Sequence, residues 1–212
     1  VADNEGIAEH VAEVYGSACA VVAYGGDHAM TAAPDDCDLG DLPATYALAL
    51  CRIEPENNVG LILEAFSELP EFPLVFVGNW ENSDYGRDLR GRFSATGHLH
   101  LLDPVYDAAK LRCVRDRAWL YVHGHSAGGT NPSLVEMMHF SVPIIAYDCN
   151  FNRYTTDNEA RYFQSCEHLR DLVTSLDDES ARQIGTTMAR IAQTHYTWAE
   201  IGSAYFRLIE SL

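Results

Sequence analysis

Residues 120–148 read LYVHGHSAGGTNPSLVEMMHFSVPIIAYD, and this stretch decides the fold class. An apolar run ends at Val122, a glycine-rich loop follows, a helix is expected to begin at Asn131 and Pro132, and a second apolar run covers residues 142–147. The order is strand, loop, helix, strand. Backbone N–H groups of residues 128–131 then converge at a helix N-terminus, which suits an anion such as a phosphate.

The same alternation extends over most of the chain. Six apolar runs predict strands at residues 18–24, 46–51, 74–77, 98–102, 119–122 and 142–147, and helical patterns separate most of them. The runs are continuously apolar, as strands covered on both faces should be. We therefore predict an α/β fold: a Rossmann-like, doubly wound parallel sheet of about six strands. Helical patterns after Asp148 predict a helical C-terminal layer, and residues 1–212 are expected to form a single domain.

The composition of the chain limits the classes of partner that it can be expected to bind. The formal net charge of −17 disfavours nucleic acid and anionic membranes. No apolar run is long enough to span a bilayer. The six cysteines, Cys19, Cys37, Cys51, Cys113, Cys149 and Cys166, include no CxxC pair. Reduced, partly buried thiols in a cytoplasmic protein are the favoured interpretation.

Several common sites are absent from the sequence. It contains no GxGxxG, GxxxxGK[ST] or HExxH pattern, so dinucleotide-binding, P-loop and zincin sites lack their key residues. His123 and His125 could place two imidazoles together, with Asp103 or Asp148 as a third ligand. Nothing in the spacing demands such a site, and we predict no metal.

Two residues near the carboxyl ends of the strands each allow two interpretations. Arg52 either points across the sheet toward an anion at residues 128–131 or pairs with Glu54 or Glu56 on the surface. Glu136 either accepts hydrogen bonds from ribose hydroxyls or only stabilises the helix dipole.

Five segments of the sequence are distinctive: CRIEPENN (51–58), LVFVGNW (74–80), LLDPVYD (101–107), HGHSAGGTNPSLVEMM (123–138) and FNRYTT (151–156). They resemble segments of retaining glycosyltransferase family 4, which has the GT-B fold. They are closest to its bacterial rhamnosyltransferase branch. The resemblance covers nearly the whole chain. It implies the C-terminal, nucleotide-sugar-binding domain of such an enzyme.

The resemblance also implies a reaction. The donor would be a nucleotide-diphosphate sugar, dTDP-L-rhamnose in this branch, with no metal or other cofactor. The acceptor would be a glycan or lipid-linked molecule of cell-surface polysaccharide synthesis. That acceptor, and any peripheral membrane contact, would be bound by a preceding N-terminal domain, which the chain lacks. The fragment alone would bind a donor but be inactive in transfer, because positioning both reactants supplies much of the rate.

Individual roles follow from the resemblance. Arg52 matches the family's diphosphate-binding arginine, and Glu136 matches its ribose-binding glutamate; we expect both to be catalytic. Two family positions differ in this chain. Asn57 stands where the family has a lysine, and Gly128 stands where the family has a second glutamate. Candidates to replace that glutamate at the sugar are His125, Ser126 and Thr130. The remaining expected contacts are the amides of Gly129, Thr130 and Asn131 for the diphosphate, with Gly78, Asn79, Leu101, Leu102 and Asp103 bordering the base.

Two other functions stay open. The altered positions favour a non-catalytic module that binds a nucleotide or sugar phosphate. Another GT-B-fold enzyme, such as a nucleotide-sugar epimerase, is the third interpretation.

Overall fold

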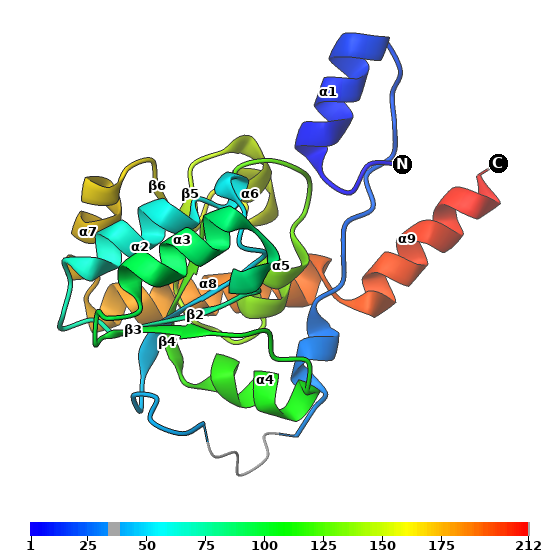
Figure 1. Cartoon of the computed structure of the whole chain (residues 1–212). Coiled ribbons are helices and arrows are strands. Elements are labelled where there is room, and N and C mark those ends of the chain that lie inside the picture. Colours follow the sequence, from blue (N-terminus) through cyan, green and yellow to red (C-terminus); the bar gives the residue numbers. More distant parts are fainter. Residues whose placement is uncertain (34–38, 212) are drawn as a thin grey trace.

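A computed structural model describes residues 1–33 and 39–211. Six parallel strands form one sheet in the order β3-β2-β1-β4-β5-β6 (Figure 1). The strands are β1 (Tyr46–Leu50), β2 (Leu74–Val77), β3 (Leu99–Leu102), β4 (Ala118–His123), β5 (Ile144–Tyr147) and β6 (Arg161–Phe163). Strand order reverses between β1 and β4, and the crevice at such a reversal is where α/β sheets bind ligands.

Helices cover both faces of the sheet. Helices α2 (Val59–Ser67), α3 (Asp84–Phe93) and α7 (Cys166–Thr174) pack on one face, and α4 (Ala108–Asp116), α5 (Pro132–Met138) and α8 (Asp178–His195) pack on the other. Strand β1 shows why its sequence is continuously apolar. Ala47 and Ala49 face the first helical layer, whereas Tyr46 and Leu48 face the second, and all four are buried. The predicted α/β doubly wound sheet is confirmed.

One predicted strand is wrong and one strand was missed. Residues 18–24 form no sheet strand; they run as an extended connector whose only described pairing is the bridge between Val21 and Ala2. Their apolar character comes from local packing, such as Tyr24 edge-on to Trp198 with ring centroids 5.0 Å apart. The missed strand β6 is only three residues long, and its first residue, Arg161, is exposed. It pairs with β5 at the sheet edge, where a short strand is tolerated.

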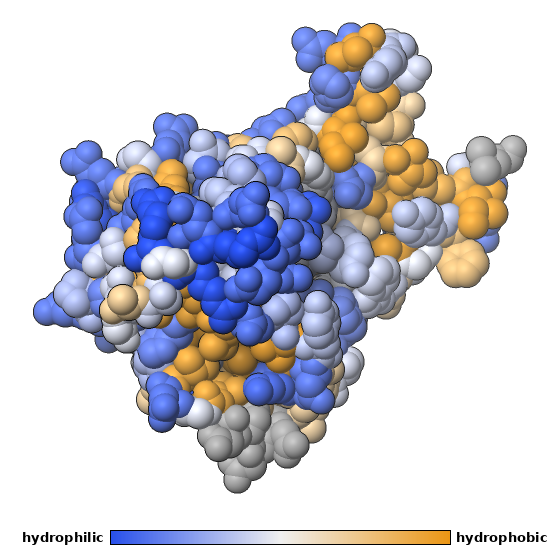
Figure 2. Space-filling view, viewed as in Figure 1, coloured by the Kyte–Doolittle hydropathy of each residue, from blue (hydrophilic) through white to orange (hydrophobic). Residues whose placement is uncertain are grey.

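Two helices project from the body. Helix α1 (Glu5–Tyr15) and helix α9 (Trp198–Glu210) extend away from the sheet, while the short α6 (Asn150–Thr155) lies at the base of α1 (Figure 1). Figure 2 shows apolar residues gathered on both projections. The exposed apolar side chains on them are Val14, Tyr15, Trp198, Tyr205, Phe206 and Ile209. The described residues also form three short 3-10 turns, at Asp27–Met30, Pro55–Asn57 and Trp80–Asn82.

The cysteines only partly follow the prediction of reduced thiols. Cys19, Cys51, Cys149 and Cys166 are free and partly buried. Cys113 is disulfide-bonded, so the prediction is wrong for that residue, and Cys37 lies outside the described residues. None of the described helices is both long and apolar enough to cross a bilayer.

Candidate functional site

A cleft of about 570 Å³ opens at the carboxyl ends of β1, β2 and β4. It therefore lies at the point where the strand order reverses. Residues from loops far apart in the sequence line it, including Arg52, Asn57, Gly78, Asn79, His125, Asn131 and Ser133. The structure thus brings together five of the predicted site residues: Arg52, Gly78, Asn79, His125 and Asn131.

The start of helix α5 forms one wall. The side chain of Asn131 caps this helix and accepts hydrogen bonds from Ser133 N at 3.0 Å and Ser133 Oγ at 2.8 Å. Tyr121 lies behind Ser133, with its hydroxyl 3.2 Å from Ser133 Oγ. Burial raises the pKa of Tyr121, so the hydroxyl stays protonated and can donate.

His123 lies next to Tyr121 and is almost fully buried. Its Nδ1 is 3.4 Å from the Tyr121 hydroxyl, and its Nε2 has no partner among the described residues. Burial, with a smaller contribution from His125, lowers the pKa of His123 to about 3. The ring is therefore neutral at physiological pH.

Arg52 lies at the mouth of the cleft, and its surroundings agree with both predictions, a position facing the cleft and a surface ion pair. Its side chain is 73% exposed and lines the cleft, yet one guanidinium nitrogen lies 3.3 Å from a Glu54 carboxylate oxygen. An exposed ion pair of this kind contributes little stability. The guanidinium is therefore free to exchange Glu54 for an anionic ligand.

The loop of residues 128–131 offers unused donors. The backbone amides of Gly128, Gly129, Thr130 and Asn131 donate no hydrogen bond within residues 1–33 and 39–211. The side chain of Thr130 is committed elsewhere: it is buried and its hydroxyl donates to the carbonyl of Asp3 at 2.5 Å. Thr130 therefore anchors the loop through its hydroxyl and can serve a ligand only through its amide.

A family model supplies the decisive comparison. Residues 42–179 match the model described as glycosyl transferases group 1. The chain belongs to this family. The match includes every residue that lines the cleft.

Solved structures agree with this glycosyl transferase fold. A glycosyltransferase from Rickettsia africae superposes with a TM-score of 0.81 at 11% identity, covering 99% of this chain and 62% of that one. Sucrose-phosphate synthase from Thermosynechococcus elongatus gives 0.78 at 14% identity, covering 100% and 58%. Anabaena HepE in complex with UDP and glucose gives 0.69 at 15% identity, covering 80% and 49%. A search of curated proteins finds no match. The chain thus spans about three fifths of the first two structures.

Glu136 of the glycosyl transferase domain does not line the cleft. Its carboxylate forms an ion pair with the buried Arg115 of α4, and its other oxygen lies 3.2 Å from His28 Nε2. Glu136 stands one helical turn beyond Asn131, on the face of α5 that meets α4 and the 3-10 turn at Asp27–Met30. In this structure the carboxylate is therefore paired with side chains of α4 and of the 3-10 turn and is not presented to the cleft.

Six further predicted residues do not line the cleft: Leu102, Asp103, Ser126, Gly128, Gly129 and Thr130. Ser126 is bound through both its amide and its hydroxyl to the carbonyl of Glu56, at 2.9 and 2.8 Å. Asp103 pairs with Arg90 at 2.8 Å. Leu102 and Asp103 border a neighbouring hollow of about 360 Å³, which shares Pro104, Val105 and Tyr106 with the cleft.

Sequence reasoning missed Ser133 and Tyr106 as lining residues. Ser133 is the second residue of α5 and follows the glycine-rich loop closely in the sequence, and this position could have marked it as a lining residue. Tyr106 is 89% exposed, and only the folded position of the loop after β3 brings it to the cleft.

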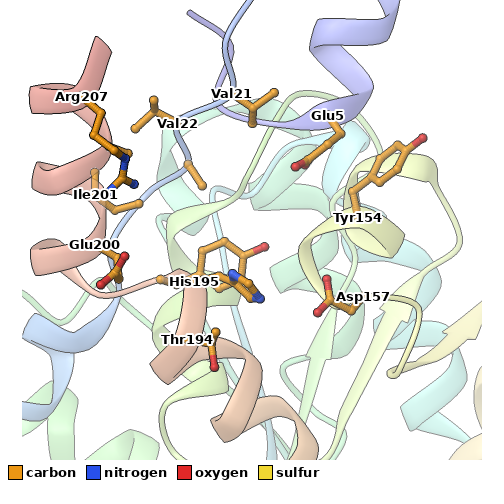
Figure 3. A pocket seen from close by; sticks show the side chains of 13 residues that line it. Glu5, Val21, Val22, Tyr154, Asp157, Thr194, His195, Glu200, Ile201 and Arg207 are labelled. Atoms are coloured by element: carbon orange, nitrogen blue, oxygen red, sulfur yellow. The ribbon is translucent and has the colours of Figure 1, made fainter. Parts of the chain in front are cut away.

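A second hollow, of about 270 Å³, lies apart from the cleft. It is bounded by α1, α6, the end of α8 and α9. Figure 3 shows Glu5 and Asp157 on one side of it and Glu200 and Arg207, from α9, on the other. None of the predicted site residues lines it.

The described residues hold no group of three or more His, Cys, Asp or Glu side chains placed to bind a metal ion. The rings of His123 and His125 are 6.0 Å apart, and the Asp148 carboxylate instead accepts from Arg153 at 2.5 Å. Asp103 is likewise engaged by Arg90.

Proposed function

We propose that this chain is the donor-binding domain of a retaining glycosyltransferase, and that residues 1–212 form that single domain. One observation carries the proposal. Arg52 lines the cleft at the strand reversal, and the loop between two other lining residues, His125 and Asn131, has amides at residues 128–131 that are unpaired among the described residues. A planar cation and a set of convergent N–H donors are suited to a diphosphate.

The same groups would assist the chemistry. When the glycosidic bond to the nucleotide breaks, negative charge develops on the leaving diphosphate. Arg52 would release Glu54 and, together with the amides of Gly129, Thr130 and Asn131, stabilise that charge. Their contribution requires no metal ligand from the chain.

Other parts of the cleft would hold the remainder of the donor. The loops after β2 and β3, at Gly78, Asn79 and Tyr106, supply a partly apolar surface for the base. Because Glu136 lies outside the cleft, we assign ribose contact to Ser133 and Asn131, which face it. This replaces the role that the resemblance implies for Glu136.

The finer identity rests on the sequence words that resemble the rhamnosyltransferase branch of family 4. We propose dTDP-L-rhamnose as donor and a glycan or lipid-linked acceptor of cell-surface polysaccharide synthesis, in the cytoplasm. The acceptor would bind an N-terminal domain, which could also contact the membrane. The present chain alone would bind the donor without efficient transfer.

A non-catalytic nucleotide-binding module is a second candidate. The observation that favours it is the position of Glu136, whose carboxylate is engaged by Arg115 and not presented to the cleft. Sugar transfer by the enzyme with its acceptor domain would support the first proposal, whereas nucleotide-sugar binding without turnover would support the second.

The first experiment is a thermal-shift panel with dTDP-L-rhamnose, UDP-glucose and GDP-mannose. A ligand at about 100 times its Kd stabilises the folded protein by about 2.7 kcal/mol. Arg52→Ala should abolish most of the shift, and the matched control Arg87→Ala, which removes an exposed arginine paired with Asp84 outside the cleft, should retain it. The absence of a shift with every nucleotide at millimolar concentration would refute the proposal.

A further inference from the structure

Asn57 holds the imidazole of His125 in one orientation. His125 Nδ1 lies 2.6 Å from Asn57 Oδ1, and Asn57 Nδ2 donates to the carbonyl of Arg52 at 2.7 Å. Because Nδ2 is committed to that carbonyl, the oxygen of the amide faces the ring, and an amide oxygen only accepts. Nδ1 therefore carries the ring proton, and Nε2 is left as a hydrogen-bond acceptor.

The Nε2 atom of His125 lies next to Gly128. A Cβ atom at position 128 would lie 3.1 Å from Nε2, closer than ordinary van der Waals contact, and the φ angle of Gly128 is +108°. Any other residue at 128 would be strained and would push the ring aside. The imidazole thus occupies the space beside the loop that a side chain at 128 would otherwise use.

The surroundings keep this ring neutral. Burial, followed by the positive charge of Arg52, lowers the pKa of His125, while Glu56 acts in the opposite direction. The hydroxyl groups of the two other side chains considered for sugar contact donate to backbone carbonyls. Ser126 is bonded to Glu56, and the hydroxyl of Thr130 is buried against Asp3.

We propose that His125 Nε2 accepts a hydrogen bond from a hydroxyl group of the donor sugar, and that Asn57 and Gly128 orient and admit the ring for this purpose. The inference rests on the proposed function, since it assumes a nucleotide sugar in the cleft. It specifies the class of sugar: a neutral hexose or deoxyhexose with a free hydroxyl at this point. A carboxylate or carbonyl there would place one acceptor against another.

The test is calorimetric binding of dTDP and of dTDP-L-rhamnose to the 212-residue chain. The quantity compared is the ratio of the two dissociation constants, because the sugar contributes to only one of them. The variants are His125→Ala and His125→Gln, which keeps an acceptor, with His10→Ala on the exposed face of α1 as control.

In His125→Ala, the gain in affinity of dTDP-L-rhamnose over dTDP should fall about fivefold to tenfold, which corresponds to one lost hydrogen bond. The affinity for dTDP itself should be unchanged. His125→Gln should recover part of it. An unchanged ratio in His125→Ala, or an equal loss of dTDP affinity, would overturn the inference. If the wild-type chain binds neither dTDP nor dTDP-L-rhamnose, the proposed function itself fails.

A second measurement needs no variant. Nitrogen NMR of the wild-type ring should show the tautomer with hydrogen on Nδ1 above the pKa of His125. Addition of dTDP-L-rhamnose should shift the Nε2 resonance as a hydrogen bond is accepted, and dTDP alone should leave it in place. A ring with hydrogen on Nε2 would contradict the proposal.

Discussion

The hydroxyl of Thr130 donates a hydrogen bond to the backbone carbonyl of Asp3, across 127 residues of sequence. Asn4 strengthens the connection: its side-chain amide lies 3.3 Å from Thr130 Oγ1 and 3.3 Å from Thr155 Oγ1 on α6. Asn4 also caps α1 by accepting from Gly6 N. The loop proposed to bind the diphosphate is therefore fixed by the same residues that begin the projecting helix α1.

Thr130→Val should weaken this connection without changing side-chain shape. The carbonyl of Asp3 and the amide of Asn4 would each lose a partner near the protein interior, so the free energy of unfolding should fall by about 1 to 3 kcal/mol. Urea denaturation measures the change. The control Thr186→Val, on the exposed face of α8, should change stability by less than about 0.5 kcal/mol. Equal effects of the two substitutions would contradict the anchoring role.

Glu136→Gln separates a packing role from a ribose-binding role. The substitution leaves the buried guanidinium of Arg115 without its carboxylate, so stability should fall by about 2 to 3 kcal/mol. Nucleotide affinity should stay within about twofold of wild type, because Glu136 does not line the cleft. A control is Glu64→Gln, whose pair with Arg92 is exposed and should cost less than about 1 kcal/mol. Loss of most nucleotide affinity with unchanged stability would restore the ribose role.

Glu54→Gln should tighten the binding of dTDP. Glu54 holds the Arg52 guanidinium at 3.3 Å, and this competition disappears when the carboxylate is replaced by an amide. We expect the dissociation constant to fall about twofold to fivefold at low ionic strength, with a smaller gain as salt rises. Isothermal titration at two salt concentrations tests this. The exposed Glu71, changed to Gln, is the control for the altered net charge. Weaker binding in Glu54→Gln would count against an Arg52 contact with the ligand.

His123 should make the fold sensitive to mild acid. Its pKa is lowered to about 3 in the folded chain, against an ordinary value of 6.5. The unfolded chain therefore binds an extra proton below about pH 6.5, and stability contributed at neutral pH is lost as the pH falls toward 3, by at most about 1.4 kcal/mol per pH unit. Groups near the ring are His125 and Tyr121, and neither supplies a compensating negative charge.

The measurement for His123 is the free energy of unfolding at pH 7.5 and pH 5.5, a range in which most carboxylates stay ionised. His123→Gln should lose part of the pH dependence that the wild-type chain shows. The same difference between the two pH values in both proteins would refute the assignment. His195→Gln, at the exposed end of α8, gives the background for removing a histidine.

Much of the fold was accessible from the sequence because buried parallel strands require continuous apolar runs. Five of the six predicted strands are present, and the alternation with helices correctly indicated the parallel sheet. Residues 18–24 misled because packing against Ala2 and Trp198 demands the same apolar character as a sheet. Strand β6 could not be predicted because three residues at a sheet edge are too few to show a hydrophobic pattern.

The site was only partly accessible for a different reason. Position along the chain places a residue near the strand ends but does not say which way its side chain points. Arg52, Asn131 and His125 do face the cleft, whereas Glu136 and Ser126 turn to protein partners. The structural role of Asn57, which the sequence showed only as a departure from the family pattern, depends on a contact across 68 residues.

The arrangement of Asn57, His125 and Gly128 has an evolutionary consequence. A lineage that replaced Gly128 with a bulkier residue would displace the ring, and one that lost Asn57 would free it to rotate. Neither change is neutral while the other two residues persist. We therefore expect the three positions to be inherited together, so that related sequences divide into those with all three and those with none. Intermediate combinations should be rare.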